Sequence, residues 1–188
     1  MMGVNWCWWV WTVAVFLMVV GSIGDNSAKG KVVLAGIGVV SKADHFERRS
    51  LLRTTVGGYP SVAGGKALLR FFVAEPSSNA EMSRLRSEAE EHGDVHLVKV
   101  DEGYDNVPEQ TLAMLQHYTA VEPAKFILKT DDDVLVRADM VVEWLDALAI
   151  AEGSKRVYAG WMVQGASVHR NGKWAVTKQE FPGDTWPR

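Results

Sequence analysis

The sequence predicts an α/β fold in which helices flank a mostly parallel sheet. Four segments have the length and apolar composition of buried strands, and they span residues 31–40, 68–74, 95–100 and 126–129. Each strand is followed by a segment with helical patterning. These segments are 41–55, a helix capped by Ser77 or Ser78, a helix that begins at Pro108, and 139–151. Strands that alternate with helices are typical of parallel sheets. An acidic triplet directly follows the fourth strand, where such sheets bind ligands.

The spacing of apolar residues predicts which side of each helix faces the sheet. In the first helix these residues are Phe46 and either Leu51 or Leu52. In the second they are Met82, Leu85 and Ala89, and Gly93 marks the end of the helix. In the third helix they are Leu112, Leu115 and Tyr118. In the fourth helix they are Met140, Val141, Trp144 and Leu148.

Three further patterns complete the predicted elements. Residues 157–162 form a fifth apolar strand, and Asn171-Gly172 is a strong turn signal that joins 167–170 to 173–177 as a hairpin. Gly36 and Gly38 match the first two glycines of a dinucleotide-binding loop, but the third glycine is absent. We therefore interpret both as glycines within a strand.

Composition excludes several classes of protein. Apolar residues make up 47% and charged residues 23% of the 188 residues, which indicates a globular chain. The net charge is −3 and no basic stripe is present, so nucleic acid is not an expected partner. Cys7 is the single cysteine, which rules out both a disulfide framework within the chain and a cysteine zinc site.

The N-terminus predicts membrane attachment. Residues 4–23 contain no charged side chain, and a helix of this length reaches about 30 Å, the thickness of a bilayer core. Four tryptophans at its start suit the membrane interface. The alternative is a cleaved signal peptide, since Val20 and Ser22 suit a cleavage site. We expect a signal-anchor at 1–24, a linker at 25–30 and a domain at 31–188, which we expect to be partial because the sequence ends within a turn-like stretch.

The acidic triplet is the strongest candidate site. Asp131, Asp132 and Asp133 follow a buried strand, and a divalent cation relieves the repulsion among adjacent carboxylates. Oxygen ligands suit Mg²⁺ or Mn²⁺. The first and third side chains of an extended Asp-x-Asp segment project to the same side. The alternative is a solvated acidic loop that caps the following helix.

A known family has the same motifs in the same order. Residues 126–136 (FILKTDDDVLV) resemble the donor motif of the beta-1,3-galactosyltransferase family, glycosyltransferase family 31. Residues 49–55, 71–73, 93–107 and 170–174 resemble four further motifs of that family. The chain is therefore identified as similar to the N-terminal part of that family's domain.

The resemblance implies a GT-A fold, a UDP-sugar donor, Mn²⁺, sugar transfer with inversion, and a Golgi membrane protein of type II topology. The acceptor would be a glycan, glycoprotein or glycolipid, and the alternative location is secretion after signal-peptide cleavage. Asp133, with Asp131, would ligate the metal ion. Asp131 and Asp132 would contact the nucleotide or a water molecule, and Arg53 and Arg49 would lie near the donor. Trp174 could line the acceptor side, although packing within the hairpin is the simpler interpretation.

Two departures from the family pattern affect the expected activity. Val56 replaces the family's tryptophan, and the family's later acidic motif, which holds its general base, would fall after Arg188. An inverting transfer needs a base within reach of the acceptor hydroxyl. No catalytic base is therefore assigned in this sequence, and we expect weak transfer or none.

Two other functions remain open on the sequence alone. One is a fragment that binds the donor without turnover. The other is a magnesium-dependent phosphatase, because its nucleophile also follows a buried strand in an Asp-x-Asp motif. Leu135 and the 55 residues after Asp133 fit that class poorly.

Overall fold

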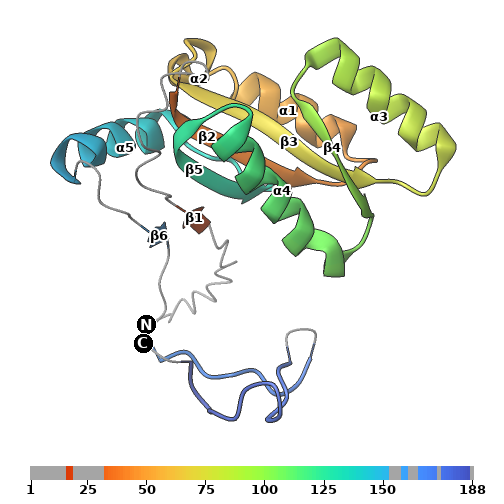
Figure 1. Ribbon diagram of the computed structural model, residues 1–188, viewed down its shortest axis with the longest axis vertical. Helices are drawn as coiled ribbons and strands as arrows, with labels where there is room; N and C mark the ends of the chain where they lie inside the picture. Colours follow the sequence, from red (N-terminus) through yellow and green to blue (C-terminus); the bar gives the residue numbers. More distant parts are fainter. Residues whose placement is uncertain (1–15, 19–31, 153–157, 161–164, 173–174, 187–188) are drawn as a thin grey trace, which may run out of the picture.

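The computed structural model describes residues 16–18, 32–152, 158–160, 165–172 and 175–186. Figure 1 shows a twisted sheet with helices on both faces. The elements, in chain order, are β1 (Phe16–Met18), β2 (Val33–Ser41), α1 (Phe46–Thr55), α2 (Pro60–Ala63), β3 (Ala67–Glu75), α3 (Asn79–His92), β4 (Val95–Asp101), the 3₁₀ helix η1 (Tyr104–Asn106), α4 (Val107–Ala120), β5 (Ala124–Asp131), α5 (Ala138–Glu152) and β6 (Tyr158–Gly160).

The strand order is β4-β3-β2-β5-β1-β6. The four adjacent strands β4, β3, β2 and β5 run parallel, whereas β1 pairs antiparallel with both β5 and β6. The predicted α/β class and the mostly parallel sheet are therefore confirmed. Each predicted parallel strand is present, and the fourth is longer than predicted because β5 runs from Ala124 to Asp131.

Two apolar layers hold the helices on the sheet. On one face, Leu52 of α1, Leu85 of α3 and Leu145 of α5 pack with inward residues of the strands. On the other face, Met114 and Tyr118 of α4 pack on the sheet in a second cluster. Helices α1, α3 and α5 thus cover one face and α4 covers the other (Figure 1).

The two glycines of β2 explain how closely α4 approaches the sheet. A Cβ atom added at Gly36 would collide with the ring of Tyr118, and one added at Gly38 would collide with Met114. Neither residue can be enlarged without displacing α4. Their interpretation as strand glycines rather than a phosphate-binding loop is confirmed.

The predicted signals at both ends of α3 are confirmed, whereas the predicted start of α1 is wrong. Ser78 caps α3 by accepting a hydrogen bond from the backbone N–H of Glu81, and Gly93 ends α3 in the left-handed conformation. Helix α1 begins at Phe46 rather than Ser41, because Ser41 is the last residue of β2.

Several predicted inward residues lie at the surface. Leu112, Met140 and Trp144 are 55%, 59% and 45% exposed, and Leu51 is exposed while Leu52 is buried. In α4 the buried face consists of Gln110, Met114, His117 and Tyr118. Helix α5 is apolar on several sides, so its sequence does not single out the face with Val142 and Leu145 that packs on the sheet.

The remaining predictions concern the two ends of the chain. Most of the predicted membrane helix at 4–23 lies outside the described residues, and Phe16–Met18 within it form strand β1 instead of a helix. Among the described residues, no helix is long and apolar enough to cross a bilayer. At 171–172 the chain turns as predicted, with Gly172 at a φ of 86°. Across this turn the backbone N–H of Val176 donates to the carbonyl oxygen of His169, as a hairpin would require. A separate isolated bridge joins Ser167 to Thr185, and Trp174 lies outside the described residues.

Candidate functional site

The acidic triplet lies where the order of the sheet changes direction. From β2 the chain passes to β3 on one side, whereas β5 pairs with β2 on the other side. Val40 is opposite Asp131 in the parallel register, so the carboxyl ends of β2 and β5 meet. Open α/β sheets bind ligands in the crevice outside such a switch point.

Asp132 is the buried member of the triplet and is held by three side chains. One carboxylate oxygen accepts hydrogen bonds from the Ser41 hydroxyl and the His45 Nδ1 atom, both at 2.7 Å. The other oxygen pairs with the Arg48 guanidinium at 2.9 Å. Burial raises the pKa of Asp132, but these hydrogen bonds outweigh it and hold the pKa below its ordinary value. Asp132 thereby fixes the turn after β5 to the segment that enters α1.

Asp131 and Asp133 differ from Asp132 in being exposed. The Asp131 side chain is 55% exposed and forms an ion pair with Lys129. The Asp133 carboxylate has no hydrogen bond or ion pair with the part of the chain that the structure describes. The first and third carboxylates therefore offer oxygen atoms to a ligand, while the middle carboxylate anchors the turn.

Arg49, predicted to lie near the donor, is fully buried. Its guanidinium donates to both oxygens of Glu88, at 2.9 and 2.7 Å, and to the Ser41 hydroxyl at 3.0 Å. It also donates to the carbonyl oxygens of Lys42 and Ala43, in the loop after β2. With its N–H groups used inside the protein, Arg49 can affect a ligand only through the loop that it holds.

Arg53 lies one helical turn further along α1, and its side chain is 16% exposed. It pairs with Asp94 through two hydrogen bonds, at 2.8 and 2.7 Å, and with Glu88 at 2.8 Å. The hydrogen bonds to Asp94 and Glu88 raise the pKa of Arg53 against the opposing effect of burial. Arg49 and Arg53 thus join α1 to α3. Among the described residues neither has a hydrogen bond or ion pair with the acidic triplet, but the Ser41 hydroxyl links Arg49 to Asp132.

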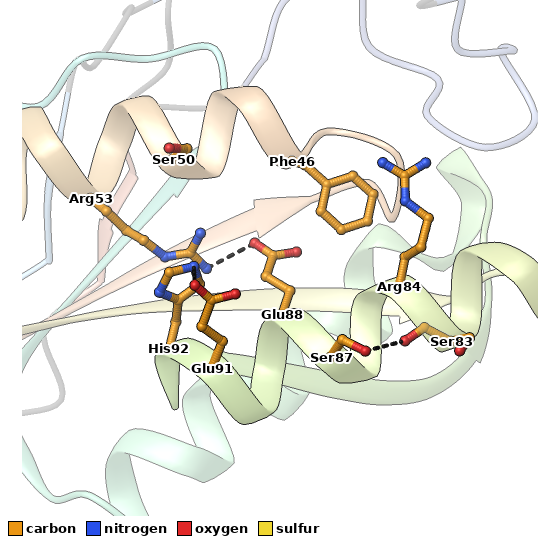
Figure 2. Close-up of a pocket in the computed structure, with 9 residues that line it drawn as sticks. All are labelled: Phe46, Ser50, Arg53, Ser83, Arg84, Ser87, Glu88, Glu91 and His92. Atoms are coloured by element: carbon orange, nitrogen blue, oxygen red, sulfur yellow. Dashed lines mark hydrogen bonds and ion pairs between the residues drawn. The ribbon is translucent and has the colours of Figure 1, made fainter.

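A cavity of about 390 Å³ lies between α1 and α3 (Figure 2). Figure 2 shows Arg53 and Phe46 reaching it from α1, with Glu88 and Arg84 on α3. None of the residues that line it belongs to the acidic triplet. The cavity is therefore separate from the acidic triplet.

Sequence reasoning missed the three side chains that hold Asp132. The sequence pattern predicts a helix that already includes Ser41, and His45 and Arg48 lack a recognisable spacing relative to a carboxylate 84 to 87 residues away. The available signal was the polar segment directly after a buried strand that neighbours β5, since loops at a switch point converge.

Residues 47–188 match the Galactosyltransferase family. The chain belongs to this family. The match includes the acidic triplet, α1 from its second residue onward, and every later element of the sheet. The family membership that the motifs predicted is confirmed.

Three relatives show how far the similarity extends. A hydroxyproline O-galactosyltransferase of Arabidopsis thaliana is 34% identical over 151 residues, which cover 80% of this chain and 22% of the relative. A beta-1,3-galactosyltransferase of the same organism is 35% identical over 153 residues, covering 80% and 23%. A human acetylgalactosaminyl-O-glycosyl-glycoprotein beta-1,3-N-acetylglucosaminyltransferase is 33% identical over 170 residues, covering 85% and 43%. The matched part of the chain thus covers between about a fifth and less than half of the length of these relatives.

Proposed function

We propose that this chain provides the donor-binding part of a GT-A-type hexosyltransferase. The sugar would move, with inversion, from a UDP-sugar to a hydroxyl group of a glycan, glycoprotein or glycolipid. One observation carries the proposal: two exposed carboxylates, Asp131 and Asp133, flank an anchored Asp132 at the switch point of a sheet within the segment that matches the family. The activities for which the relatives are named, galactosyl and N-acetylglucosaminyl transfer, support the hexosyl class.

The donor atoms fit a hard divalent cation. Carboxylate oxygens are the ligands that Mn²⁺ and Mg²⁺ prefer, and Asp131 and Asp133 are accessible to solvent. We assign Asp133 and Asp131 as the residues that would hold the cation. When bound, such a cation neutralises the diphosphate of the donor and stabilises the charge on the leaving group.

The neighbouring side chains would orient the donor and the turn that binds it. Asp132 is committed to Ser41, His45 and Arg48, so it keeps the flanking carboxylates directed outward. Arg48 is 48% exposed and brings positive charge beside the acidic triplet, where a diphosphate would bind. Arg49 and Arg53 would contribute indirectly, because they fix α1 and the loop after β2.

Membrane attachment through residues 4–23 and a Golgi location are part of the same proposal, and secretion after cleavage is the alternative. An antibody to a C-terminal tag distinguishes them in cells that express the full chain. Retention in the Golgi membrane fraction, with the tag protected from added protease, is expected. Tagged protein that collects in the medium would contradict it.

A calorimetric titration tests the donor site directly. UDP is titrated into the 188-residue chain with and without Mn²⁺, and then into Asp133→Ala. We expect binding that depends on Mn²⁺ and that weakens by at least about tenfold in the variant, since loss of an outer-shell partner of a metal alone costs about 10–100-fold. Asp146→Ala is the matched control, because Asp146 is an exposed carboxylate on α5 that pairs with Lys66.

The outcomes separate the competing functions. A folded chain that binds no UDP, or binds it equally well after Asp133→Ala, contradicts the assigned site. UDP binding without release of sugar from the donor in the presence of acceptors identifies a donor-binding fragment. Hydrolysis of a generic aryl phosphate would revive the phosphatase alternative, against which the family match at the triplet already argues.

A further inference from the structure

A second group of side chains that can ligate a metal lies beneath α4. His96 belongs to β4, His117 to the last turn of α4, and Glu122 to the connection from α4 to β5. One ring nitrogen of each histidine and one oxygen of the carboxylate lie within 4.8 Å of one another. Helix α4 covers the face of the sheet opposite α1 and α3, so this group is separate from Arg49, Arg53 and the cavity.

The contacts within the group leave one nitrogen without a partner. The Nε2 atom of His117 is 2.7 Å from a carboxylate oxygen of Glu122. The rings of His96 and His117 have centroids 4.0 Å apart. The Nε2 atom of His96 is buried and has no hydrogen bond with any residue that the structure describes. An unpaired buried polar atom is unfavourable, and a metal ion would satisfy it.

We propose that His96, His117 and Glu122 bind a divalent cation of the zinc type. Two imidazole nitrogens and one carboxylate oxygen form a ligand set that Zn²⁺ accepts, with water in the fourth position. Glu122 is 29% exposed, so an ion and its water can reach the group from solvent. Tetrahedral ligands at zinc distances are about 3.4 Å apart, so small side-chain rotations bring the three atoms into place.

Arg70 of β3 orients the carboxylate. Its guanidinium donates to both oxygens of Glu122, at 2.6 and 2.5 Å. Ligating carboxylates in proteins are commonly held by hydrogen bonds of this kind. The hydrogen bonds from Arg70 outweigh burial and lower the pKa of Glu122 to about 2, so the group is ionised at neutral pH. Burial lowers the pKa of His96 to about 4, so its ring is neutral and retains a lone pair.

The chemistry of this group differs from that of the acidic triplet. Two nitrogens favour Zn²⁺, Co²⁺ or Ni²⁺, whereas the oxygens of Asp131 and Asp133 favour Mn²⁺ or Mg²⁺. A bound cation would tie the end of α4 to β4 and, through Arg70, to β3. Because Glu122 is two residues before β5, this site would stabilise the strand that carries the acidic triplet.

Cobalt spectroscopy on the full chain is the first test. The protein is stripped with a chelator and titrated with Co²⁺, and the visible absorption bands report ligation in a four- or five-coordinate site. Zn²⁺ affinity is then measured by competition with a chromogenic chelator. We expect one equivalent to bind with the visible bands, and Zn²⁺ to displace the Co²⁺ while Mg²⁺ does not.

Matched variants locate the site. His96→Leu removes the nitrogen and keeps an apolar side chain against Phe72, which stacks on the His96 ring. We expect it to weaken Zn²⁺ binding by about tenfold or more, at unchanged circular dichroism. His92→Gln, on α3, and Asp133→Ala are controls that should leave this binding unchanged. The Asp133→Ala control also separates this proposal from the donor site.

A measurement on the unaltered chain guards against misfolded variants. The ring resonances of the histidines are followed by nuclear magnetic resonance, with and without Zn²⁺. Shifts of the His96 and His117 resonances but not of the His92 resonances are expected. Unchanged resonances on addition of Zn²⁺, a Co²⁺ spectrum without the visible bands, or Zn²⁺ affinity that is unchanged in a folded His96→Leu variant would overturn the proposal.

Discussion

The inner face of α1 and its N-terminal turn hold charged side chains in contrasting environments. On the inner face, Arg49 is fully buried and, together with Arg53, pairs with Glu88 of α3. In the N-terminal turn, Arg48 is 48% exposed and pairs with Asp132. Residues 48 and 49 differ by about 100° around the helix, because an α-helix has 3.6 residues per turn. Two adjacent residues of α1 therefore make different contacts: Arg49 binds Glu88 of α3, and Arg48 binds Asp132 of the acidic triplet.

The two regions should respond differently to substitution. Removal of one partner from a buried ion pair leaves an uncompensated charge, whereas an exposed pair exchanges its partner for water at little cost. Changes on the inner face should therefore appear mainly in the free energy of unfolding. Changes at the N-terminal turn should appear mainly in donor binding.

The largest expected effect is that of Arg49→Met. Glu88 would keep only Arg53 as a partner, and the carbonyl groups of Lys42 and Ala43 would lose a donor. We expect the free energy of unfolding to fall by about 3–5 kcal/mol, measured by urea denaturation with circular dichroism. Arg86→Met, at an exposed site on α3, should change it by no more than about 0.5 kcal/mol. Similar values for both variants would remove the distinction between the two regions.

Asp132→Asn is expected to have the second-largest effect, and one that depends on pH. Ser41, His45 and Arg48 would lose an anionic acceptor, so we expect a loss of about 1–3 kcal/mol at pH 7. The pKa of Asp132 is lower in the folded chain than the value of about 3.9 in an unfolded chain. The carboxylate therefore stabilises the fold above about pH 4, and this contribution disappears as the pH falls through the folded pKa.

Urea denaturation of both proteins between pH 7 and pH 3 measures this prediction. The difference between Asp132→Asn and the unaltered chain should shrink as the solution becomes more acidic. Asp146→Asn serves as the control, because its exposed ion pair with Lys66 should give a small difference at every pH. A difference for Asp132→Asn that stays constant with pH would mean that its carboxylate does not carry the stabilisation.

The same contrast explains what the sequence could predict. Buried strands appear as apolar runs, and Ser78 and Gly93 end α3 through contacts within a few residues, so local patterns are sufficient for both. The acidic triplet was found because it directly follows such a strand. The partner of Arg49, by contrast, lies 39 residues away on another helix. Local spacing therefore gave no reason to prefer Arg48 over Arg49 as the residue beside the triplet.

The cluster of His96, His117 and Glu122 illustrates the same limit. Its three residues come from β4, α4 and a loop, and their spacing matches no metal-binding motif. The predicted face of α5 was partly wrong for a related reason, because Met140 and Trp144 belong to a helix that is apolar on several sides. Only the packing of α5 on the sheet determines which side is buried.

The smallest effect on stability is expected for Arg48→Gln, and it gives the clearest separation of the two regions. Arg48 is 48% exposed, and the buried Asp132 would keep its hydrogen bonds from Ser41 and His45, so the pair with Arg48 should contribute about 1 kcal/mol or less to the free energy of unfolding. UDP affinity in the presence of Mn²⁺ should nevertheless fall, by about threefold to tenfold, because the variant removes positive charge from beside the acidic triplet. The loss should be smaller at high salt, which screens exposed charges.

Arg137→Gln is the matched control for this variant. Arg137 is also exposed and pairs with an aspartate, Asp139, but it lies at the start of α5 and makes no contact with Asp132. Calorimetry should therefore show unchanged UDP affinity in Arg137→Gln and reduced affinity in Arg48→Gln at nearly equal stability. If Arg48→Gln instead lost as much stability as Asp132→Asn and bound UDP normally, both regions of α1 would be structural. The donor would then have to be held by the exposed carboxylates without help from α1.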